Sequence, residues 1–210
     1  MLLKEEITVL ANNQSKAQRK PVFGVAINDS PYMSELTIDG KRVFCPAQRA
    51  WRDMLRRCFD LKYHKKFPTY AGCKPCQEWL FFSGFLKWWK VNHKDGLQLD
   101  KDIIGNGKIY SPDTCVYIPS WINVFNSDCA ASRGEYKIGV SFDSRIGKFS
   151  ASCSKGILGG NGRIGYFPTE EDAHKAWKST KIEMAKSLKN RMDDIDKRIY
   201  PSIINKIKGR

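Results

Sequence analysis

Residues 135–177 read EYKIGVSFDSRIGKFSASCSKGILGGNGRIGYFPTEEDAHKAW. Three apolar segments of strand length in it are separated by glycine-containing turns: residues 136–142, 148–153 and 163–167. Thr169 then stands before three acidic residues, the pattern of an N-cap followed by carboxylates in the first turn of a helix. Apolar residues continue at helical spacing, so we expect this helix to run to Leu188. The stretch therefore predicts a three-stranded sheet followed by one long helix.

Short motifs within this stretch come in a fixed order: EYKIGV at 135–140, GKFSA at 147–151, GYFPTEEDA at 165–173 and AW at 176–177. They resemble the DNA-binding domain of the plant ethylene-response-factor transcription factors. In that family a three-stranded antiparallel sheet packs on the helix and lays its outer face in the major groove of DNA. The resemblance therefore implies a domain at 134–190 that binds double-stranded DNA, although most arginines of the plant pattern are missing here.

The alternation of side chains along the strands gives the candidate DNA contacts. If Val140, Phe149 and Ala151 face the helix, their neighbours in the strands point to the opposite side. The outward candidates are Lys137, Ser141, Arg145, Lys148, Ser150, Ser152 and Arg163. The plain alternative is a sheet-and-helix module that only packs and binds no nucleic acid.

The charge of the chain is compatible with a nucleic-acid partner. There are 36 Lys and Arg residues against 22 Asp and Glu, a net charge of +14. The excess is spread along the chain, because residues 131–210 hold 17 basic and 9 acidic residues. Such an excess is typical of proteins that bind polyanions, and a basic surface that only aids solubility is the alternative. An RNA-binding accessory role has only this charge in its favour.

Nothing in the chain suggests a membrane or secretory location. The longest apolar run, residues 79–86, is far shorter than the roughly 20 residues of a membrane span. Acidic residues occupy positions 5 and 6, where a secretory signal would carry its apolar stretch. We therefore expect no membrane partner and a cytoplasmic location, in the host cytoplasm if a phage encodes the chain.

The amino-terminal part predicts a polar arm, short strands and two helices. Residues 22–27 and 36–44 look like strands, the second with a turn at Asp39 and Gly40. A helix opening at Pro46 has one apolar face, formed by Trp51, Met54, Leu55 and Cys58. A second helix at 78–91 is rich in aromatic residues whose spacing favours core packing over stacking on nucleobases.

Residues 97–126 predict a strand at 97–102, a turn-rich loop, a strand at 115–118 and a short helix at 119–126. The stretches LDKD at 99–102, GNGKIYSPDTCVYIP at 105–119 and INVFN at 122–126 resemble the core of bacteriophage HNH homing endonucleases. That family has a ββα-metal fold with this order of elements. With the two resemblances, the chain is expected to be α+β and to have four parts: a flexible arm at 1–20, an HNH-like nuclease region with a helical preface at 21–130, the sheet-and-helix domain at 134–190 and a basic tail at 191–210. The arm and the tail are inferred from their polar and basic composition. The boundary is expected at 128–133.

The HNH resemblance also implies a metal site. In the family an Asp that ends the first strand and an Asn or His on the helix hold one metal ion, and these positions match Asp100 and Asn123, with Asn126 one turn further. Hard oxygen ligands of this kind suit Mg²⁺ or Mn²⁺. The general base of the family is a His directly after the Asp, where this chain has Lys101. His93 is an alternative base, but it lies thirty residues from Asn123, and a plain polar-loop residue is the simpler interpretation.

The cysteines allow two interpretations. Four of them would form a thiolate site for zinc: Cys45, Cys58, Cys73 and Cys76. A single CxxC pair is a weak signal, and buried reduced thiols are the simpler explanation, since Cys58 lies on the apolar face of its helix.

Two functions follow from these patterns. The first is a metal-dependent homing-type endonuclease that hydrolyses phosphodiester bonds of double-stranded DNA. The second is a catalytically decayed HNH-like protein that binds DNA for regulation. Asp100, Asn123 and Asn126 favour the enzyme, whereas Lys101 in place of the usual His favours the decayed form.

Overall fold

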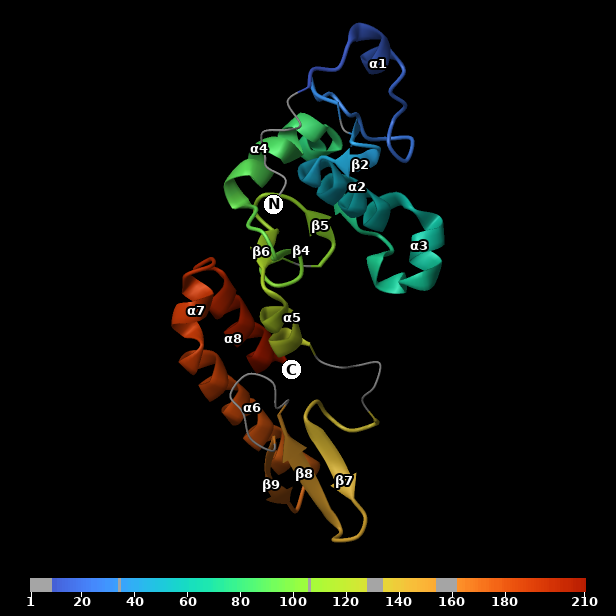
Figure 1. Cartoon of the computed structure of the whole chain (residues 1–210). Coiled ribbons are helices and arrows are strands. Elements are labelled where there is room, and N and C mark those ends of the chain that lie inside the picture. The colour runs from blue at the N-terminus through green and yellow to red at the C-terminus, as the bar shows by residue number, and fades with distance from the viewer. Residues whose placement is uncertain (1–8, 34, 106, 128–133, 154–161) are drawn as a thin grey trace. The chain divides into compact units, whose positions relative to one another are not determined.

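The chain folds into two compact units, Met1–Tyr117 and Ile118–Arg210. The computed structural model describes residues 9–33, 35–105, 107–127, 134–153 and 162–210 (Figure 1). Both units combine helices with strands, which confirms the α+β class. The division falls just before the helix at 120–126, earlier than the predicted boundary at 128–133, which lies outside the described residues.

The described part of the predicted arm is folded. It contains the short helix α1 (Asn13–Ala17). Arg19 follows, and its guanidinium donates hydrogen bonds to the carbonyl oxygens of Asn28, Ser30 and Tyr32 at 3.0, 2.5 and 2.7 Å. One side chain thus ties the segment to three residues that lie 9, 11 and 13 positions further along the chain, which composition alone does not show. Residues 1–8 lie outside the described residues.

A tight turn replaces the strand predicted at 22–27. The amide of Val22 donates to the carbonyl of Ala26 at 2.7 Å, and Gly24 takes the left-handed conformation with φ +77°. The second predicted segment does form a hairpin of β1 (Glu35–Ile38) and β2 (Lys41–Phe44). Both residues of its Asp39-Gly40 turn have positive φ, as a type I′ turn requires.

The core of the first unit lies between two helices. In α2 (Pro46–Phe59) the predicted apolar face is fully buried, with Trp51, Met54 and Leu55 at 0 % exposure. The second helix is shorter than predicted: a 3₁₀ turn, η2 (Gln77–Leu80), precedes α4 (Phe82–Asn92). The chain is extended at Phe81 because this residue forms a β-bridge with Ile27. The Ile27 amide donates to the carbonyl of Leu80, and the Ile27 carbonyl accepts from the amide of Phe82. Four of the aromatic residues in this region are buried, which confirms core packing: Trp79, Phe82, Phe85 and Trp89.

The rest of the first unit consists of short elements. They are α3 (Leu61–Lys66), the 3₁₀ turn η1 (Pro68–Tyr70), β3 (Lys74–Pro75), β4 (Gln98–Asp100), β5 (Ile109–Tyr110) and β6 (Val116–Ile118). Strand β4 pairs with β6, so both predicted strands exist in shorter form. The parallel pair β3–β5 was not predicted, because two-residue strands carry no periodicity.

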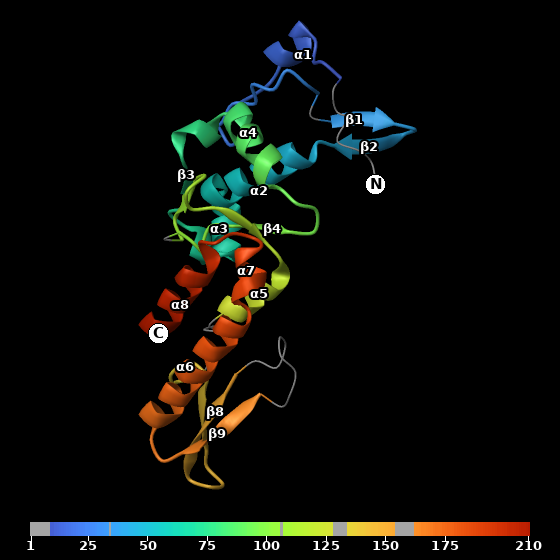
Figure 2. The same ribbon diagram turned by 90° about the vertical axis from the view of Figure 1, so that its left-hand side faces the viewer.

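The second unit begins with α5 (Ser120–Asn126), close to its predicted bounds. Its sheet consists of β7 (Val140–Asp143), β8 (Lys148–Ser152) and β9 (Arg163–Phe167), antiparallel and in the order β7-β8-β9. Helix α6 (Glu170–Ser187) lies along one face of this sheet (Figure 2). Val140 and Ala151 are buried there against Ala173. The hydroxyl of Thr169 accepts a hydrogen bond from the Asp172 amide at 3.1 Å, which confirms the predicted N-cap.

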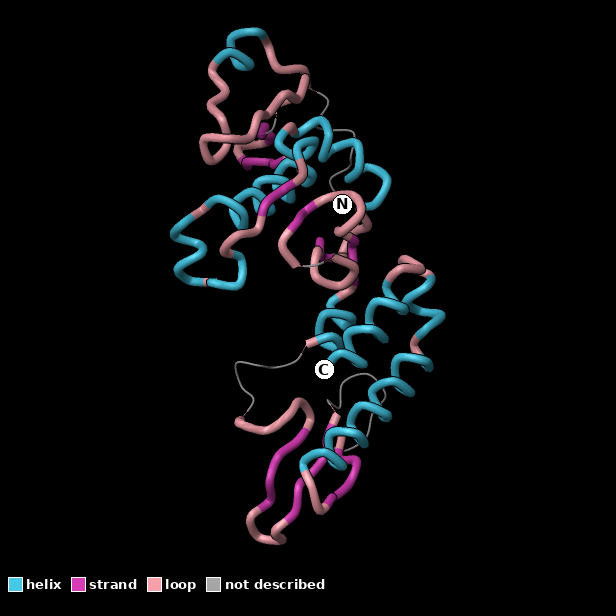
Figure 3. Tube along the Cα trace, turned by 180° about the vertical axis from the view of Figure 1, so that it is seen from behind, coloured by secondary structure: helices cyan, strands magenta, loops and turns pink. Residues whose placement is uncertain are grey.

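The predicted basic tail is instead part of the fold. Residues 189–209 form α7 (Lys189–Asp193) and α8 (Ile199–Gly209), which turn back along α6 (Figure 3). Ile199, Ile203 and Ile207 are buried at a four-residue spacing, so α8 has an apolar stripe for this contact. The guanidinium of Arg210 then donates to the main-chain oxygen of Asn126 at 2.5 Å, tying the last residue to the end of α5.

Candidate functional site

The face of the sheet opposite α6 carries a row of polar side chains across all three strands. Ser141 pairs with Ser150, and Ser150 pairs with Tyr166, so the three side chains share one side. Ser141 and Tyr166 are exposed, whereas Ser150 on the central strand is 9 % exposed between them. Strand alternation therefore places Ser150 on the outward face, but its neighbours cover it. Ser150 on the central strand and Ser141 on β7 have short side chains, so they add little height to this face.

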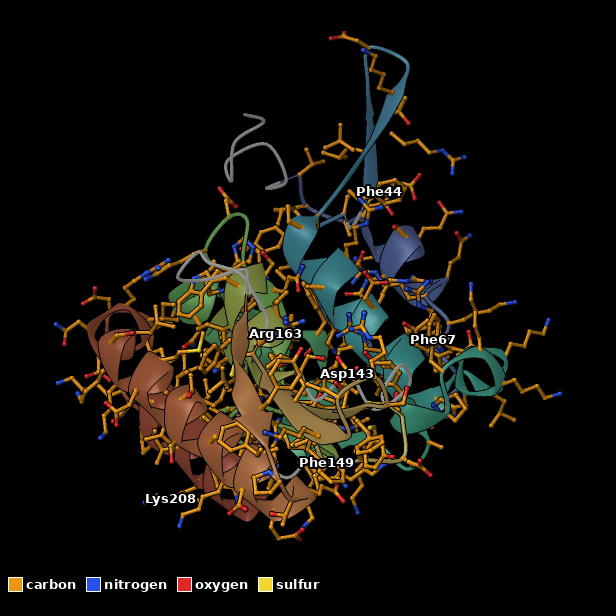
Figure 4. The ribbon with its side chains drawn as sticks, turned by 90° about the horizontal axis from the view of Figure 1, so that it is seen from below. Phe44, Phe67, Asp143, Phe149, Arg163 and Lys208 are labelled. Atoms are coloured by element: carbon orange, nitrogen blue, oxygen red, sulfur yellow. The ribbon has the colours of Figure 1, made fainter. Side chains whose placement is uncertain are left out.

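An ion pair organises one end of this face. Arg145 donates from Nε and Nη2 to the two carboxylate oxygens of Asp143 at 3.1 and 3.0 Å. Asp143 is labelled in Figure 4. These hydrogen bonds hold the pKa of Asp143 below its usual range. The hydroxyl of Tyr166 reaches the same carboxylate at 3.5 Å. Asp143 thus binds Arg145, a predicted DNA contact, and also lies within reach of the Tyr166 hydroxyl.

Two further cations border the row. Lys148 is opposite Asp143 in the sheet and is exposed. Arg163 is exposed at the start of β9, opposite Ser152, and its guanidinium carbon lies 5.1 Å from the centre of the Tyr166 ring. The ladder shifts register between Ala151 and Ser152, next to this pair. The predicted outward residues of β8 and β9 therefore do lie on one face.

Lys137 is not on this face. Gly139 has φ +79°, and the strand begins only at Val140, so Lys137 precedes it. The amine of Lys137 forms an ion pair with Glu171 in the first turn of α6, and its amide donates to Glu170 at 2.6 Å. The assignment of Lys137 to the outward sheet face is therefore wrong. The charge of Lys137 is paired with Glu171 in the first turn of α6.

Sequence reasoning missed Tyr166 and Asp143 on this face. Asp143 was detectable, because it lies two residues after Ser141 in the same strand and so points the same way. Tyr166 depends on the register of β9 against β8, which the sequence does not give.

The candidate metal ligand Asp100 ends β4, as predicted. Its Oδ1 accepts hydrogen bonds from the amides of Asp102 and Ile103 at 2.8 and 2.6 Å. Burial raises the pKa of this carboxyl despite those two bonds. The carboxylate of Asp100 thus stabilises the turn that follows β4. Asp100 belongs to the first unit.

Lys101 is buried, with a side chain that is 5 % exposed. Its Nζ lies 2.7 Å from the Asp102 carboxylate, 5.4 Å from the ring centre of Tyr70 and 5.5 Å from that of Tyr110. A carboxylate and two ring faces are favourable partners for an ammonium. These contacts enclose the amine, whereas a general base has to reach the water that it deprotonates.

The remaining predicted nuclease residues have other contacts. Asn123 and Asn126 lie on α5 in the second unit, whereas Asp100 belongs to the first. The amide oxygen of Asn126 accepts a hydrogen bond from Arg210 at 3.3 Å, which places a cation where a metal ion would bind. The ring of His93 stacks on Trp89 at 4.1 Å and is packed in an aromatic cluster.

The cysteines of the proposed zinc site have different surroundings. Cys58 and Cys73 are buried in the core, whereas Cys45 and Cys76 are half-buried. Burial raises the pKa of the Cys58 thiol to about 12, and it also raises the pKa of Cys76. Zinc binds the thiolate, which burial disfavours. Among the described residues, no group of three or more His, Cys, Asp and Glu side chains is placed to hold a metal ion.

Comparisons with models of protein families, with curated proteins and with solved structures found no match. The two resemblances of the sequence therefore remain predictions, and the function is argued from the sites themselves. Over the part of the chain that the structure describes, no helix has both the length and the apolar character needed to cross a membrane.

Proposed function

We propose that this chain binds double-stranded DNA through the open face of the β7–β8–β9 sheet. The observation that carries the proposal is the row Ser141, Ser150 and Tyr166, bordered by the exposed cations Lys148 and Arg163. The major groove of B-DNA is about 12 Å wide and admits a β-ribbon. Serines at the centre allow the strands to come close to the base edges, because they add little height to the face.

The bordering side chains have complementary roles in this proposal. Arg163 is stacked beside Tyr166, so part of its conformational freedom is already lost before binding. A guanidinium in this position donates two parallel hydrogen bonds to O6 and N7 of a guanine. Lys148 neutralises a backbone phosphate as a point charge. Asp143 binds Nε and Nη2 of Arg145 and so holds this guanidinium at the β7–β8 turn, where its charge favours a nearby phosphate.

A matched pair of lysine variants tests the sheet face. A preferred duplex is first selected from a random library with the full chain, and binding is then measured by fluorescence anisotropy over a range of salt. We expect Lys148→Ala to make the log–log salt slope shallower by about 0.9, the value for one phosphate contact on B-DNA. Lys175→Ala removes one exposed lysine from α6 and should leave the slope unchanged.

Arg163→Ala tests base recognition on the same duplex. Loss of one bidentate contact to guanine costs about 1–3 kcal/mol of discrimination, which corresponds to a loss of roughly 5- to 150-fold in preference for the selected sequence. Circular dichroism confirms that each variant is folded. If both sheet variants bind as tightly and as selectively as Lys175→Ala, the DNA-binding face lies elsewhere and the proposal fails.

A metal-dependent endonuclease is the second candidate. It is favoured by the position of Asp100 at the end of β4, which pairs with β6, in the order β4, β5, β6 and α5 over residues 98–126. Mg²⁺ or Mn²⁺ at this carboxylate would activate water for attack on a phosphodiester. The amine of Lys101 is engaged with Asp102, so the base would have to come from another group.

Asp100→Asn is the sharp test of this candidate. The amide keeps an oxygen that can accept from the Asp102 and Ile103 amides, but the anionic ligand is lost. We expect wild type to nick supercoiled DNA with Mg²⁺ or Mn²⁺ and not with a chelator, and Asp100→Asn to bind DNA normally without nicking it. If wild type yields no metal-dependent product on the selected site, only the binding function of a decayed nuclease remains.

A further inference from the structure

Helix α2 exposes a row of arginines on the side away from the core. Arg49, Arg52 and Arg56 are all exposed, and they recur at i, i+3 and i+7 on one side of the helix. The opposite side holds Trp51 and Leu55, both fully buried. The helix therefore has one face fixed in the core and one strongly basic face in solvent.

The segment that continues from this helix is also basic. Residues 46–67 contain seven Lys and Arg residues and two Asp, a net charge of +5 within 22 residues. Both acidic side chains in this segment already have partners. Asp60 accepts hydrogen bonds from two amides at the start of α3, and Asp53 forms an ion pair with Arg56 at 3.1 Å.

The other two arginines of the row are differently placed. Within the described ranges Arg49 and Arg52 form no ion pair, and both line a shallow depression together with Phe44, Gln48 and Asp53. The side chain of Phe44, labelled in Figure 4, is 45 % exposed at the rim of this depression. The depression thus presents two guanidinium groups and an exposed aromatic ring, which suit a partner that is anionic and also has an apolar part.

We propose that this surface, the α2 arginine surface of Phe44, Arg49 and Arg52, binds the sugar-phosphate backbone of a nucleic acid duplex. Side chains three residues apart on a helix lie about 5–6 Å from each other at Cβ, so both guanidinium groups can engage the same stretch of backbone. A guanidinium matches phosphate with two parallel hydrogen bonds. The exposed ring of Phe44 supplies the apolar contact for a sugar. Backbone contacts position a protein without reading the sequence.

This inference goes beyond the function proposed for the sheet. The arginine surface belongs to the first unit and the sheet belongs to the second, so each can be altered without touching the other. The sheet face would carry the sequence preference, and the α2 arginine surface would add affinity that is the same on every sequence. The two ideas therefore fail independently.

The test compares two double variants of the full chain that remove equal charge from exposed helical positions. Arg49→Ala/Arg52→Ala alters the α2 arginine surface, and Lys87→Ala/Lys90→Ala removes two lysines from α4. The probes are the selected duplex and a duplex of unrelated sequence. Alanine favours helix at each of these positions, so both variants should fold, which circular dichroism checks.

We expect the arginine variant to make the log–log salt slope shallower by about 1.8 on both duplexes, as two lost phosphate contacts require. Its preference for the selected duplex over the unrelated one should stay at the wild-type value. The α4 control should keep the wild-type slope, and Arg49→Lys/Arg52→Lys should retain most of it because the charges remain. Lys148→Ala/Arg163→Ala should instead lower the preference.

Two results would overturn the inference. One is a salt slope for Arg49→Ala/Arg52→Ala equal to that of the α4 control, which would mean that the arginines touch no phosphate. The other is displacement by polyglutamate of the chain from the unrelated duplex as efficient as that by unlabelled duplex, which would indicate an acidic protein as the partner. If the sheet variants behave as wild type while the arginine variant loses slope, the function proposed for the sheet fails and this inference stands.

Discussion

Replacing Gly139 by alanine should unfold the sheet domain locally. Gly139 precedes β7 with φ +79°, in the left-handed region that residues with a Cβ avoid. A Cβ at this position would lie 2.0 Å from Cδ1 and 2.3 Å from Cγ of Trp177. The indole has no room to retreat, because it is buried with Ile138 and Cys153 and stacked on His174 at 5.5 Å.

The expected cost has two parts. Forcing a residue with a Cβ into the left-handed conformation costs about 1–2 kcal/mol. Crowding a packed core adds about 1–3 kcal/mol, since the tryptophan or the turn must shift. Gly139→Ala should therefore lower the local unfolding free energy by about 2–5 kcal/mol. The DNA binding that we propose for the sheet face should weaken in parallel, because β7 carries Ser141 and Asp143.

Gly147→Ala is the matched control. Gly147 also has positive φ, +62°, but no atom lies within 4 Å of the added Cβ. It should show only the backbone cost of about 1–2 kcal/mol. Hydrogen exchange with mass spectrometry on peptides from 136–153 measures the local opening free energy in the full chain. Equal losses in the two variants would refute the close contact of Gly139 with Trp177.

Three further perturbations test the first unit and the end of the chain. Burial raises the pKa values of the Cys58 and Cys115 thiols to about 12 from the usual 9.0. These thiols therefore ionise at lower pH in the unfolded chain than in the folded one. The free energy of unfolding, measured in urea, should fall as pH rises from about 9 to 12. Lys101→Met should keep or raise stability in the same assay, because an apolar chain fills the site, while Lys101→Ala leaves a cavity and should cost about 2–4 kcal/mol. Arg210→Ala removes the hydrogen bonds to Asn126 and should speed amide exchange at the end of α5, with the exchange of β9 unchanged as its control.

Local signals predicted the elements that depend on local physics. The apolar face of α2, the Asp39-Gly40 hairpin and the Thr169 cap are each specified within a few residues, and the structure confirms them. The helix predicted at 78–91 failed because Phe81 pairs with Ile27, a contact between distant segments. The prediction of a basic tail at 191–210 did not hold, because isoleucines at a four-residue spacing among the basic residues form the buried stripe of α8.

The candidate sites divide in the same way. Strand alternation placed Ser141 and Lys148 on one outward face, because the period of two is a property of the strand itself. Arg163 shares this face with Tyr166, three residues away, because the β8–β9 ladder shifts register between Ala151 and Ser152. Burial could not be predicted in this way. Lys101 is enclosed by Tyr70 and Tyr110, and the distances in sequence to both rings are too large for any local pattern to reveal.

The salt dependence of DNA binding by the wild-type chain tests both proposed surfaces in one measurement, the log–log slope of affinity against salt concentration. The sheet offers Lys148 as a phosphate contact and Arg163 as a base contact, and the α2 arginine surface offers Arg49 and Arg52 as phosphate contacts. The log–log slope should be about −0.9 if only the sheet meets the duplex, about −1.8 if only the α2 arginine surface does, and about −2.7 if both do. From the spread of its charge the chain is expected to make roughly 5–9 contacts, with a slope of about −4 to −8. A slope near −1.8 would show that one surface remains off the DNA, whereas a slope steeper than −4 would require cations beyond these four.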